Sequence, residues 1–138
     1  MAGYSGTPLV KKLGFKEGFC AGLVNPPRGF ENELLPMPND VSISVGTLIK
    51  PLDLIILFAD SQNGLKKEFR GLARKLSQNG MLWVAWPKKA SGVTTDLSEN
   101  NVRDIGLHAG LVDVKVCAIN DIWSGLKFVY RLADRKSR

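Results

Sequence analysis

The segment LDLIILF at residues 52–58 constrains the fold more than any other part of the chain. Apart from Asp53 it is apolar without a break, which is typical of a strand covered on both faces in a parallel sheet. A second run of this kind, GMLWVAWP at 80–87, ends at Pro87, which has no N–H to donate to a neighbouring strand. Two such strands predict a parallel sheet with helices on its faces.

The sequence between these two runs has the spacing of an amphipathic helix. Apolar residues recur at three- and four-residue intervals from Leu65 to Leu76, and Asn79-Gly80 is expected to end the helix. The opposite face is basic, and we interpret it as solvated surface, with nucleic-acid binding as the alternative. That basic face consists of Lys66, Lys67, Arg70, Arg74 and Lys75.

The first third of the chain predicts further elements of the same kind. TPLVKKLG at 7–14 predicts a short helix capped by Thr7 and stopped by Gly14. FCAGLV at 19–24 predicts a buried strand and VSISV at 41–45 predicts another, with a helical turn expected between them at about residues 30–35.

The last third of the chain predicts a helix followed by a β-hairpin. Asp96 with Glu99 three residues later is an acidic relative of the capping box, so a helix is expected to begin there and to end at Gly110. The strands of the hairpin are expected at 111–118 and 126–132. In the first of them Val112, Val114 and Val116 should share one side and Asp113, Lys115 and Cys117 the other.

Strands that alternate with helices imply parallel crossovers, and the closing hairpin adds an antiparallel strand. The expected architecture is therefore a three-layer α/β sandwich with a mostly parallel, Rossmann-like sheet that ends in an antiparallel hairpin. With 138 residues, 44% of them hydrophobic, the chain is expected to be a single domain over residues 1–131 followed by a basic tail at 132–138.

Composition restricts the function classes. The longest apolar runs are far too short to span a membrane and the N-terminus lacks a signal-peptide pattern, so we expect a cytoplasmic protein without membrane contact. Half of the net charge of +6 lies in residues 131–138, where four basic residues face one acid, and this favours a solvated terminus over nucleic-acid binding. Cys20 and Cys117 lie in different predicted strands and are expected to be buried thiols, without a disulfide framework or zinc site.

Four motifs resemble a family of small bacterial proteins described as a domain of unknown function, and the resemblance extends from Tyr4 to about Arg131. The layout also resembles the class I S-adenosylmethionine-dependent methyltransferase fold, shortened by about one strand-helix unit after Val45. These resemblances imply a fold and leave the activity open. The motifs are YSGTPLVKKLG, LWVAWPKKASGVTTDL, GLVDVKVCAI and WSGLKFV.

A methyltransferase of that class holds its cofactor with a glycine-rich turn after the first strand and an acid after the second. In this chain the first turn is NPPRG at 25–29, in which Pro26 and Pro27 remove two backbone donors. The residues after the second predicted strand, Gly46-Thr47-Leu48, include no carboxylate. We therefore expect no cofactor and no methyl transfer, with S-adenosylmethionine as the alternative.

A candidate ligand site lies where the predicted strands end, because open α/β sheets bind ligands beyond the carboxyl ends of their strands. This rule brings Asn25, Asp60 and Ser61 close to the loop WPKKASGVTTD at 86–96. The loop combines positive charge, hydroxyls and backbone donors next to a helix start, which suits a phosphate or carboxylate. The alternative is that Asp96 caps the helix and the lysines only keep the loop soluble. The candidate ligand-binding residues are Asn25, Trp86, Lys88, Lys89, Ser91, Thr94 and Thr95.

No pattern in the sequence indicates catalysis. His108 is the only histidine and is expected to interact with the C-terminal end of a helix dipole. No nucleophile elbow, metal-ligand cluster or P-loop occurs, so no catalytic residue and no metal ligand is assigned. Trp83, Trp86 and Trp123 are expected to cover the core, with an interface role for Trp123 as the alternative.

These patterns favour a non-catalytic domain that binds a small anionic molecule or a protein partner at the 86–96 loop. A diverged methyltransferase, or another enzyme with a nucleotide-type cofactor, is the first alternative. A nucleic-acid binder that uses the 66–75 helix face and the tail is the second. The hairpin strands at 111–131 leave a homodimer open.

Overall fold

The computed structural model describes residues 7–46 and 51–135. The motif residues 4–6, Thr47 and Leu48 of the turn after the second strand, and tail residues 136–138 lie outside this range. Six strands are present in the described residues: β1 (Cys20–Val24), β2 (Ser42–Val45), β3 (Leu52–Phe58), β4 (Leu76–Pro87), β5 (Leu111–Ala118) and β6 (Trp123–Tyr130).

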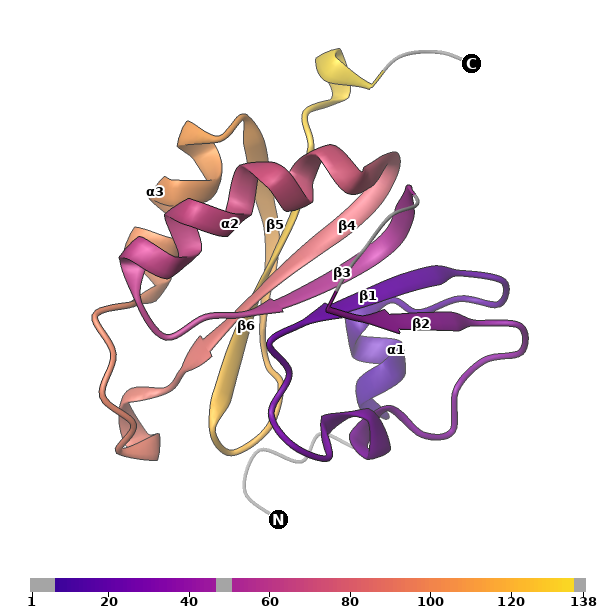
Figure 1. The fold of residues 1–138 in the computed structure, drawn as a ribbon, viewed down its shortest axis with the longest axis horizontal. Coiled ribbons are helices and arrows are strands. Elements are labelled where there is room, and N and C mark those ends of the chain that lie inside the picture. Colours follow the sequence, from indigo (N-terminus) through magenta and orange to yellow (C-terminus); the bar gives the residue numbers. More distant parts are fainter. Residues whose placement is uncertain (1–6, 47–50, 136–138) are drawn as a thin grey trace.

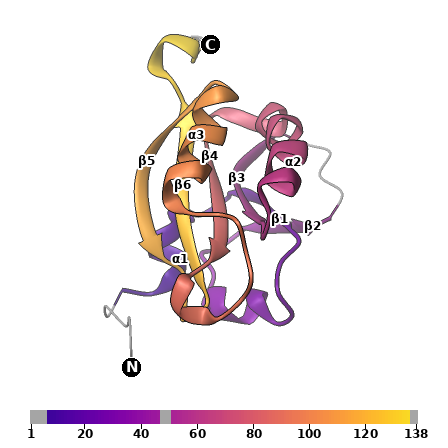
Figure 2. The ribbon, with the colours of Figure 1, turned by 90° about the vertical axis from the view of Figure 1, so that its left-hand side faces the viewer.

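The six strands form one sheet with the order β2-β1-β3-β4-β6-β5. β2, β1, β3 and β4 are parallel, whereas β6 runs antiparallel to both β4 and β5. The predicted α/β class and the antiparallel closing strand are confirmed. β6 lies inside the sheet and β5 forms its edge, as Figure 2 shows.

The described residues also form three α-helices and three short 3₁₀ turns, of which α1 precedes the first strand and η3 follows the last. Figure 1 shows α2 and α3 side by side on one face of the sheet, while α1 lies on the other. The elements are α1 (Leu9–Leu13), η1 (Phe30–Leu34), α2 (Gln62–Lys75), η2 (Lys89–Ser91), α3 (Glu99–His108) and η3 (Leu132–Asp134).

β3 shows why its sequence is apolar throughout. Ile55 and Leu57 belong to the core under α2 and α3, whereas Leu54 and Ile56 belong to the core under α1 and η1. All four side chains are completely buried. A strand at the centre of a three-layer sandwich has no solvent-facing side, and the continuous apolar run follows from this position.

α2 is shorter than the sequence predicts. The helix ends at Lys75 rather than at Asn79-Gly80, because Leu76 pairs with Leu52 at the start of β3. Gly80 is buried near this pairing, where an added Cβ would lie 2.9 Å from the carbonyl oxygen of Leu52. The glycine thus permits close strand contact instead of ending a helix.

Two predicted helix caps are wrong. The N-cap of α1 is Pro8, so Thr7 is not the N-cap residue of this helix. The N-cap of α3 is Ser98, which forms a capping box with Asn101 rather than the expected pair of Asp96 and Glu99. Hydroxyl and amide groups at this spacing satisfy the first free N–H groups of α3 as well as carboxylates would.

The hairpin also differs from the expectation in detail. Its second strand starts at Trp123, three residues earlier than expected, and Asp113 and Lys115 of β5 face consecutive residues of β6. This bulge breaks the expected alternation, and Val114 and Val116 are about half exposed, at 52% and 49%. The cysteines, Cys20 and Cys117, are free but only half-buried, not fully buried as expected.

Candidate ligand site at the strand ends

The carboxyl ends of β1, β3 and β4 meet at one edge of the sheet. Val24 pairs with Leu57, and the Ala59 N–H donates to the Ala85 carbonyl over 2.9 Å. The strand order reverses between β1 and β3, because β2 lies on one side of this pair and β4 on the other. Such a switch point is the usual ligand position in open α/β sheets.

The loop after β4 begins in a fixed position. Trp86, which is 6% exposed, pairs with Ser124 of β6, and the Lys88 N–H donates to the Ile122 carbonyl over 2.7 Å. Trp86 packs in the core under α2 and α3. Its role in the described structure is therefore to anchor the start of the loop.

Two candidate hydroxyls are bonded to backbone. Ser91 Oγ donates to the Lys88 carbonyl over 2.6 Å and accepts from the Val93 N–H over 3.2 Å. Thr95 Oγ1 donates to the Asp60 carbonyl over 2.6 Å and accepts from the Leu97 N–H over 3.1 Å. Thr95 therefore joins the loop to the end of β3, as the predicted grouping with Asp60 requires.

Asp96 serves a different helix from the one expected. Its Oδ1 accepts from the Gln62 N–H over 2.8 Å at the start of α2. Its carbonyl oxygen accepts from the side-chain amides of Gln62 and Asn101, each over 2.9 Å. A carboxylate thus lies against the positive end of α2, where Ser61 also accepts from the Gly64 N–H.

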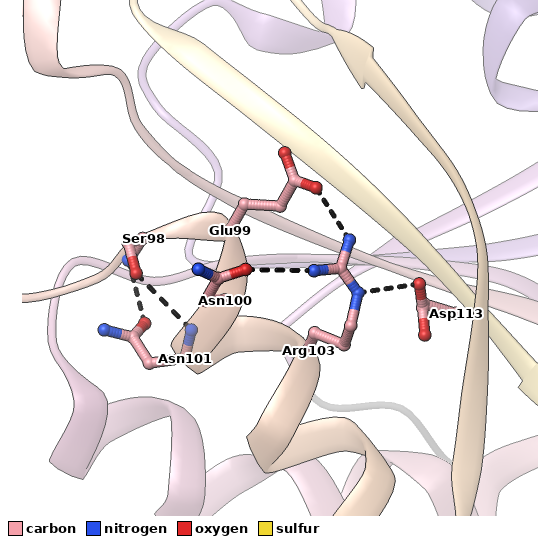
Figure 3. Close-up of polar contacts among 6 residues, drawn as sticks. All are labelled: Ser98, Glu99, Asn100, Asn101, Arg103 and Asp113. Atoms are coloured by element: carbon pink, nitrogen blue, oxygen red, sulfur yellow. Dashed lines mark hydrogen bonds and ion pairs between the residues drawn. The ribbon is translucent and has the colours of Figure 1, made fainter.

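Arg103 joins α3 to β5 (Figure 3). Its guanidinium donates to Glu99 over 2.6 Å, to Asp113 over 2.9 Å and to Asn100 over 3.2 Å. The hydrogen bonds to Glu99 and Asp113 raise the pKa of Arg103. With its donors directed at these groups, Arg103 holds the helix against the sheet and is not free for a ligand.

Three candidate residues, Lys88, Lys89 and Thr94, differ from Ser91 and Thr95 in the bonding of their side chains. In the part of the chain that the structure describes, none of these three side chains has a hydrogen-bond or ion-pair partner. Lys88 is half-buried beside the end of β4, and Lys89 and Thr94 are exposed. The loop therefore presents two uncompensated ammonium groups.

Asn25 lies at the end of β1 in a left-handed conformation, with φ of 56°. Its side-chain amide donates to Glu68 of α2 over 3.1 Å. This bond connects the turn after β1 to α2, so the structure brings Asn25 to the same edge as Asp60 but binds its amide to a carboxylate. A ligand would have to compete with Glu68 for that donor.

The turn after β1 does not fit the way in which class I methyltransferases hold S-adenosylmethionine. Pro26 and Pro27 supply no N–H groups, and Gly29 leads into the five-residue 3₁₀ turn η1 rather than into an α-helix. A cofactor-binding turn needs backbone donors and a helix N-terminus at this position. Here two of the five positions of the turn lack such a donor, and a 3₁₀ turn takes the place of the helix.

His108 lies in the last turn of α3, as expected. Its Nδ1 is 2.8 Å from the Asp104 carbonyl oxygen, and Arg70 of α2 donates to the His108 carbonyl over 2.9 Å. Among the residues that the structure describes, no group of three or more His, Cys, Asp or Glu residues is placed to hold a metal ion. Through these contacts His108 takes part in the hydrogen bonding at the C-terminal end of α3 and in its attachment to α2.

One feature that the sequence analysis missed is a cleft of about 460 Å³ between α2 and α3. The buried side chains of Phe69 and Ile105 line it together with polar residues, among them Lys66 and Asp104. The sequence predicted both helices and their polar faces. The cleft depends on how the two helices pack against each other, for which no local sequence signal exists.

Comparisons with known proteins agree with this topology. No protein-family profile matches the chain, and no curated protein matches it by sequence. Solved structures do match. The magnesium protoporphyrin IX methyltransferase of Synechocystis PCC 6803, with bound SAH, superposes with a TM-score of 0.59 and 11% identity over 89% of this chain and 78% of its own. A SAM-dependent methyltransferase from Aquifex aeolicus superposes with a TM-score of 0.63 and 16% identity, over 87% of this chain and 86% of its own.

The O-methyltransferase family 2 protein of Planctomyces limnophilus, in complex with apigenin, gives a TM-score of 0.65 and 12% identity. This chain is covered over 83% of its length but spans only 50% of that protein. The fold is methyltransferase-like. At these identities the similarity establishes the fold alone. Among the described residues no helix is long and apolar enough to cross a membrane.

Proposed function

We propose that this chain is a non-catalytic binding domain on a methyltransferase-like scaffold, and that Lys88 and Lys89 hold a small anionic molecule at the end of β4. The supporting observation is the contrast within one loop. Ser91, Thr95 and Asp96 have their side chains bonded to backbone groups, whereas the two ammonium groups have no partner in the described residues. Free positive charge beside a topological switch point suits a phosphate or a carboxylate.

In this proposal the other candidate residues position the loop. Trp86 anchors its start in the core, and Ser91 and Thr95 fix its path through their backbone bonds. Asn25 borders the site from β1, and Thr94 supplies an unpaired hydroxyl. None of these residues is given a catalytic role, because the described side chains form no acid-base or nucleophile pair at this edge.

The test is the melting temperature in inorganic phosphate and in citrate at constant ionic strength. An anion that binds only the folded state must raise it with concentration. The variant K88A/K89A should lose this stabilisation, while the matched control K67A/K75A, two exposed lysines of α2, should retain it. Equal stabilisation of the wild type and K88A/K89A would contradict the proposal.

A protein partner is the second form of the binding proposal, and the exposed edge strand favours a second copy of the chain. Among the described residues β5 pairs with β6 alone and forms the edge of the sheet, and its Val114 and Val116 are about half exposed. Apolar residues on an unprotected edge favour strand pairing between molecules. Sedimentation of the wild type and of V116K should then show a dimer that the variant loses, and a wild-type monomer at all concentrations would refute it.

An enzyme remains the alternative function, supported by the strand order and by the similarity to methyltransferases solved with SAH or SAM. Concentration-dependent stabilisation by S-adenosylhomocysteine would overturn the anion proposal and reopen catalysis, despite Pro26 and Pro27. The third proposal is nucleic-acid binding through the five basic residues of α2. An electrophoretic gel-shift assay that shows no complex, or a complex that does not weaken with salt, would exclude it.

The family, the cellular location and the domain bounds expected from the sequence are proposals as well. We propose that the chain belongs to the small bacterial family of unknown function that its motifs resemble, and that it is cytoplasmic. We also propose that residues 1–131 form the domain and 132–138 a basic tail. Limited proteolysis should then remove the tail and leave the melting temperature of the remaining fragment unchanged.

A further inference from the structure

Four lysines gather on the face of the β5–β6 hairpin opposite α3, and we call them the lysine cluster: Lys12, Lys16, Lys115 and Lys127. Lys115 and Lys127 are directly opposite each other in the antiparallel register. Lys115 Nζ donates to the Lys12 carbonyl over 3.3 Å, and Lys12 Nζ donates to the Ala118 carbonyl over 3.0 Å. These bonds hold α1 against the end of β5.

The orientation of Lys127 follows from its neighbours. Leu126 and Phe128 belong to the core under α2 and α3, so Lys127 between them points to the opposite face. Its cross-strand partner in β4 is Trp83, which lies in the core under α1. Lys127 therefore lies on the same face of the sheet as α1. It is half-buried, at the border between the part of this face that α1 covers and the part that is exposed to solvent.

The lysines act on one another electrostatically. Burial lowers the pKa of Lys127, and the charges of Lys115 and Lys16 lower it further. Burial raises the pKa of the neighbouring Cys117 thiol, while Lys12 and Lys115 oppose that change. The charges of Lys115 and Lys127, which the strand register places opposite each other, repel one another, and the charge of Lys16 acts on Lys127 in the same direction.

The cluster has no acidic counterpart. In residues 7–46 and 51–135, none of the four lysines forms an ion pair. Asp113, two positions from Lys115 in β5, is bonded to Arg103 on the α3 side. Like charges directly opposite in neighbouring strands are unfavourable, and no ion pair among the described residues compensates this pair.

We propose that the lysine cluster is a binding site for a small polyphosphorylated anion, whose phosphoryl groups supply the missing negative charge. Lysine ammonium groups on flexible stems act as separate point charges rather than as a fork for one carboxylate. Four of them, from α1, the segment after it and two strands, match an anion with several linked phosphates. Trp83, the cross-strand neighbour of Lys127, is completely buried and offers no face for a base to stack on, which favours a small polyphosphate over a nucleic acid.

This site is separate from the one proposed for the 86–96 loop. Its residues lie in α1, β5, β6 and the segment after α1, whereas Lys88 and Lys89 follow the carboxyl end of β4. Ligand binding at one site can therefore fail without affecting the other. Variants of the lysine cluster and of the 86–96 loop distinguish the two sites.

Titration calorimetry with sodium tripolyphosphate tests the proposal. K115Q/K127Q should weaken binding at least tenfold, whereas K67Q/K75Q, with the same change of charge on α2, should bind as the wild type does. K115R/K127R keeps both charges and should retain binding. The single variant K115Q, at an exposed position, should weaken binding in the same direction and covers the case in which the half-buried Lys127 cannot be replaced without unfolding.

Four outcomes would overturn the proposal. They are no binding by the wild type, equal losses in K115Q/K127Q and K67Q/K75Q, a loss seen only in K88A/K89A, or tighter cluster-dependent binding of a thymidine oligonucleotide than of tripolyphosphate. The second would mean a response to net charge alone. The third would assign the anion to the 86–96 loop, in support of the proposed function. The fourth would make the surface a nucleic-acid site.

Discussion

The two faces of the sheet differ in how completely helices cover them. On one face α2 and α3 lie over a core that extends from β1 to β6, with Phe69 and Phe128 in an edge-to-face contact at a centroid distance of 5.3 Å. On the other face α1 and η1 cover the sheet around β1, β3 and β4. There Lys115 and Lys127 occupy β5 and β6 beyond the edge of α1.

The connections between strands explain this difference. The β3–β4 connection contains α2 and the β4–β5 connection contains α3, and both helices pack on the same face. The β1–β2 connection contains only the five-residue turn η1, and the β5–β6 connection at 119–122 contains no helix. A helix covers about 10 Å of sheet width, so a crossover without one leaves polar strand positions in solvent. Polar binding surfaces are therefore expected on the sparsely covered face.

The largest predicted effect concerns the covered face. In G106A the new Cβ would overlap the ring of Phe128, which packs directly against this glycine of α3. We expect a loss of about 3 kcal/mol in the free energy of unfolding from overpacking. The control is G71A in α2, where a Cβ meets open space and should stabilise the helix by up to ~1 kcal/mol. Urea denaturation measures both, and equal effects would mean that α3 is not closely packed.

The second prediction concerns the other face. W83F removes the buried hydrogen bond of 2.8 Å from Trp83 Nε1 to the Leu13 carbonyl, which attaches α1 to the sheet. The unpaired carbonyl and the lost ring volume should cost about 2 kcal/mol. W86F, on the covered face, removes no protein hydrogen bond of the indole in the described residues and should cost less. A larger loss for W86F than for W83F would show that this bond does not hold α1.

The third prediction concerns the junction between α2 and the 86–96 loop. D96A removes the acceptor of the Gln62 N–H and should destabilise the protein by about 1 kcal/mol, as the loss of a helix cap does. The exposed Glu17 lies outside every helix and strand, so E17A is the matched loss of a carboxylate and should be neutral. Thermal unfolding of both variants measures the difference, and an unchanged D96A would contradict the assignment of Asp96 to α2.

The smallest effect should appear at alkaline pH. Burial raises the pKa of Tyr130, whose hydroxyl donates to the Ala73 carbonyl at the end of α2. Above the pKa of an unfolded tyrosine, about 10, the unfolded chain loses this proton more readily than the folded one. This contribution to stability is present below that pH and declines as pH rises toward the folded pKa. Urea midpoints between pH 8 and 11 should fall more for the wild type than for Y130F, and parallel curves would exclude the effect.

Local sequence patterns predicted much of the fold correctly. The bounds of β3 and β5 agree with the expected segments 52–58 and 111–118, because apolar runs and alternation depend on neighbouring residues alone. The errors occur where local signals compete. Asn79-Gly80 is a plausible helix end, but the pairing of Leu76 with Leu52 ends α2 earlier. Asp96 is a plausible cap for α3, but it bonds to Gln62, 34 residues away along the chain.

For the candidate site, the sequence predicted which segments meet but not how their side chains are bonded. The sequence placed Asn25, Asp60 and the 86–96 loop at one edge of the sheet, and the contact of Thr95 with Asp60 agrees with this. It did not predict that Ser91 and Thr95 use their hydroxyls for the loop itself, or that Asn25 bonds to Glu68. Whether a polar side chain is free depends on partners that are distant in sequence.

The sequence by itself determined the α/β class, the parallel centre of the sheet and the proline-bearing turn after β1, because each depends on contiguous residues and their backbone preferences. The tertiary structure decided the insertion of β6 between β4 and β5, the convergence of Lys12 with Lys115 and Lys127, and the cleft between α2 and α3. These features arise from long-range packing. Burial fixes which segments become neighbours, and only then do their charges and hydrogen bonds act on one another.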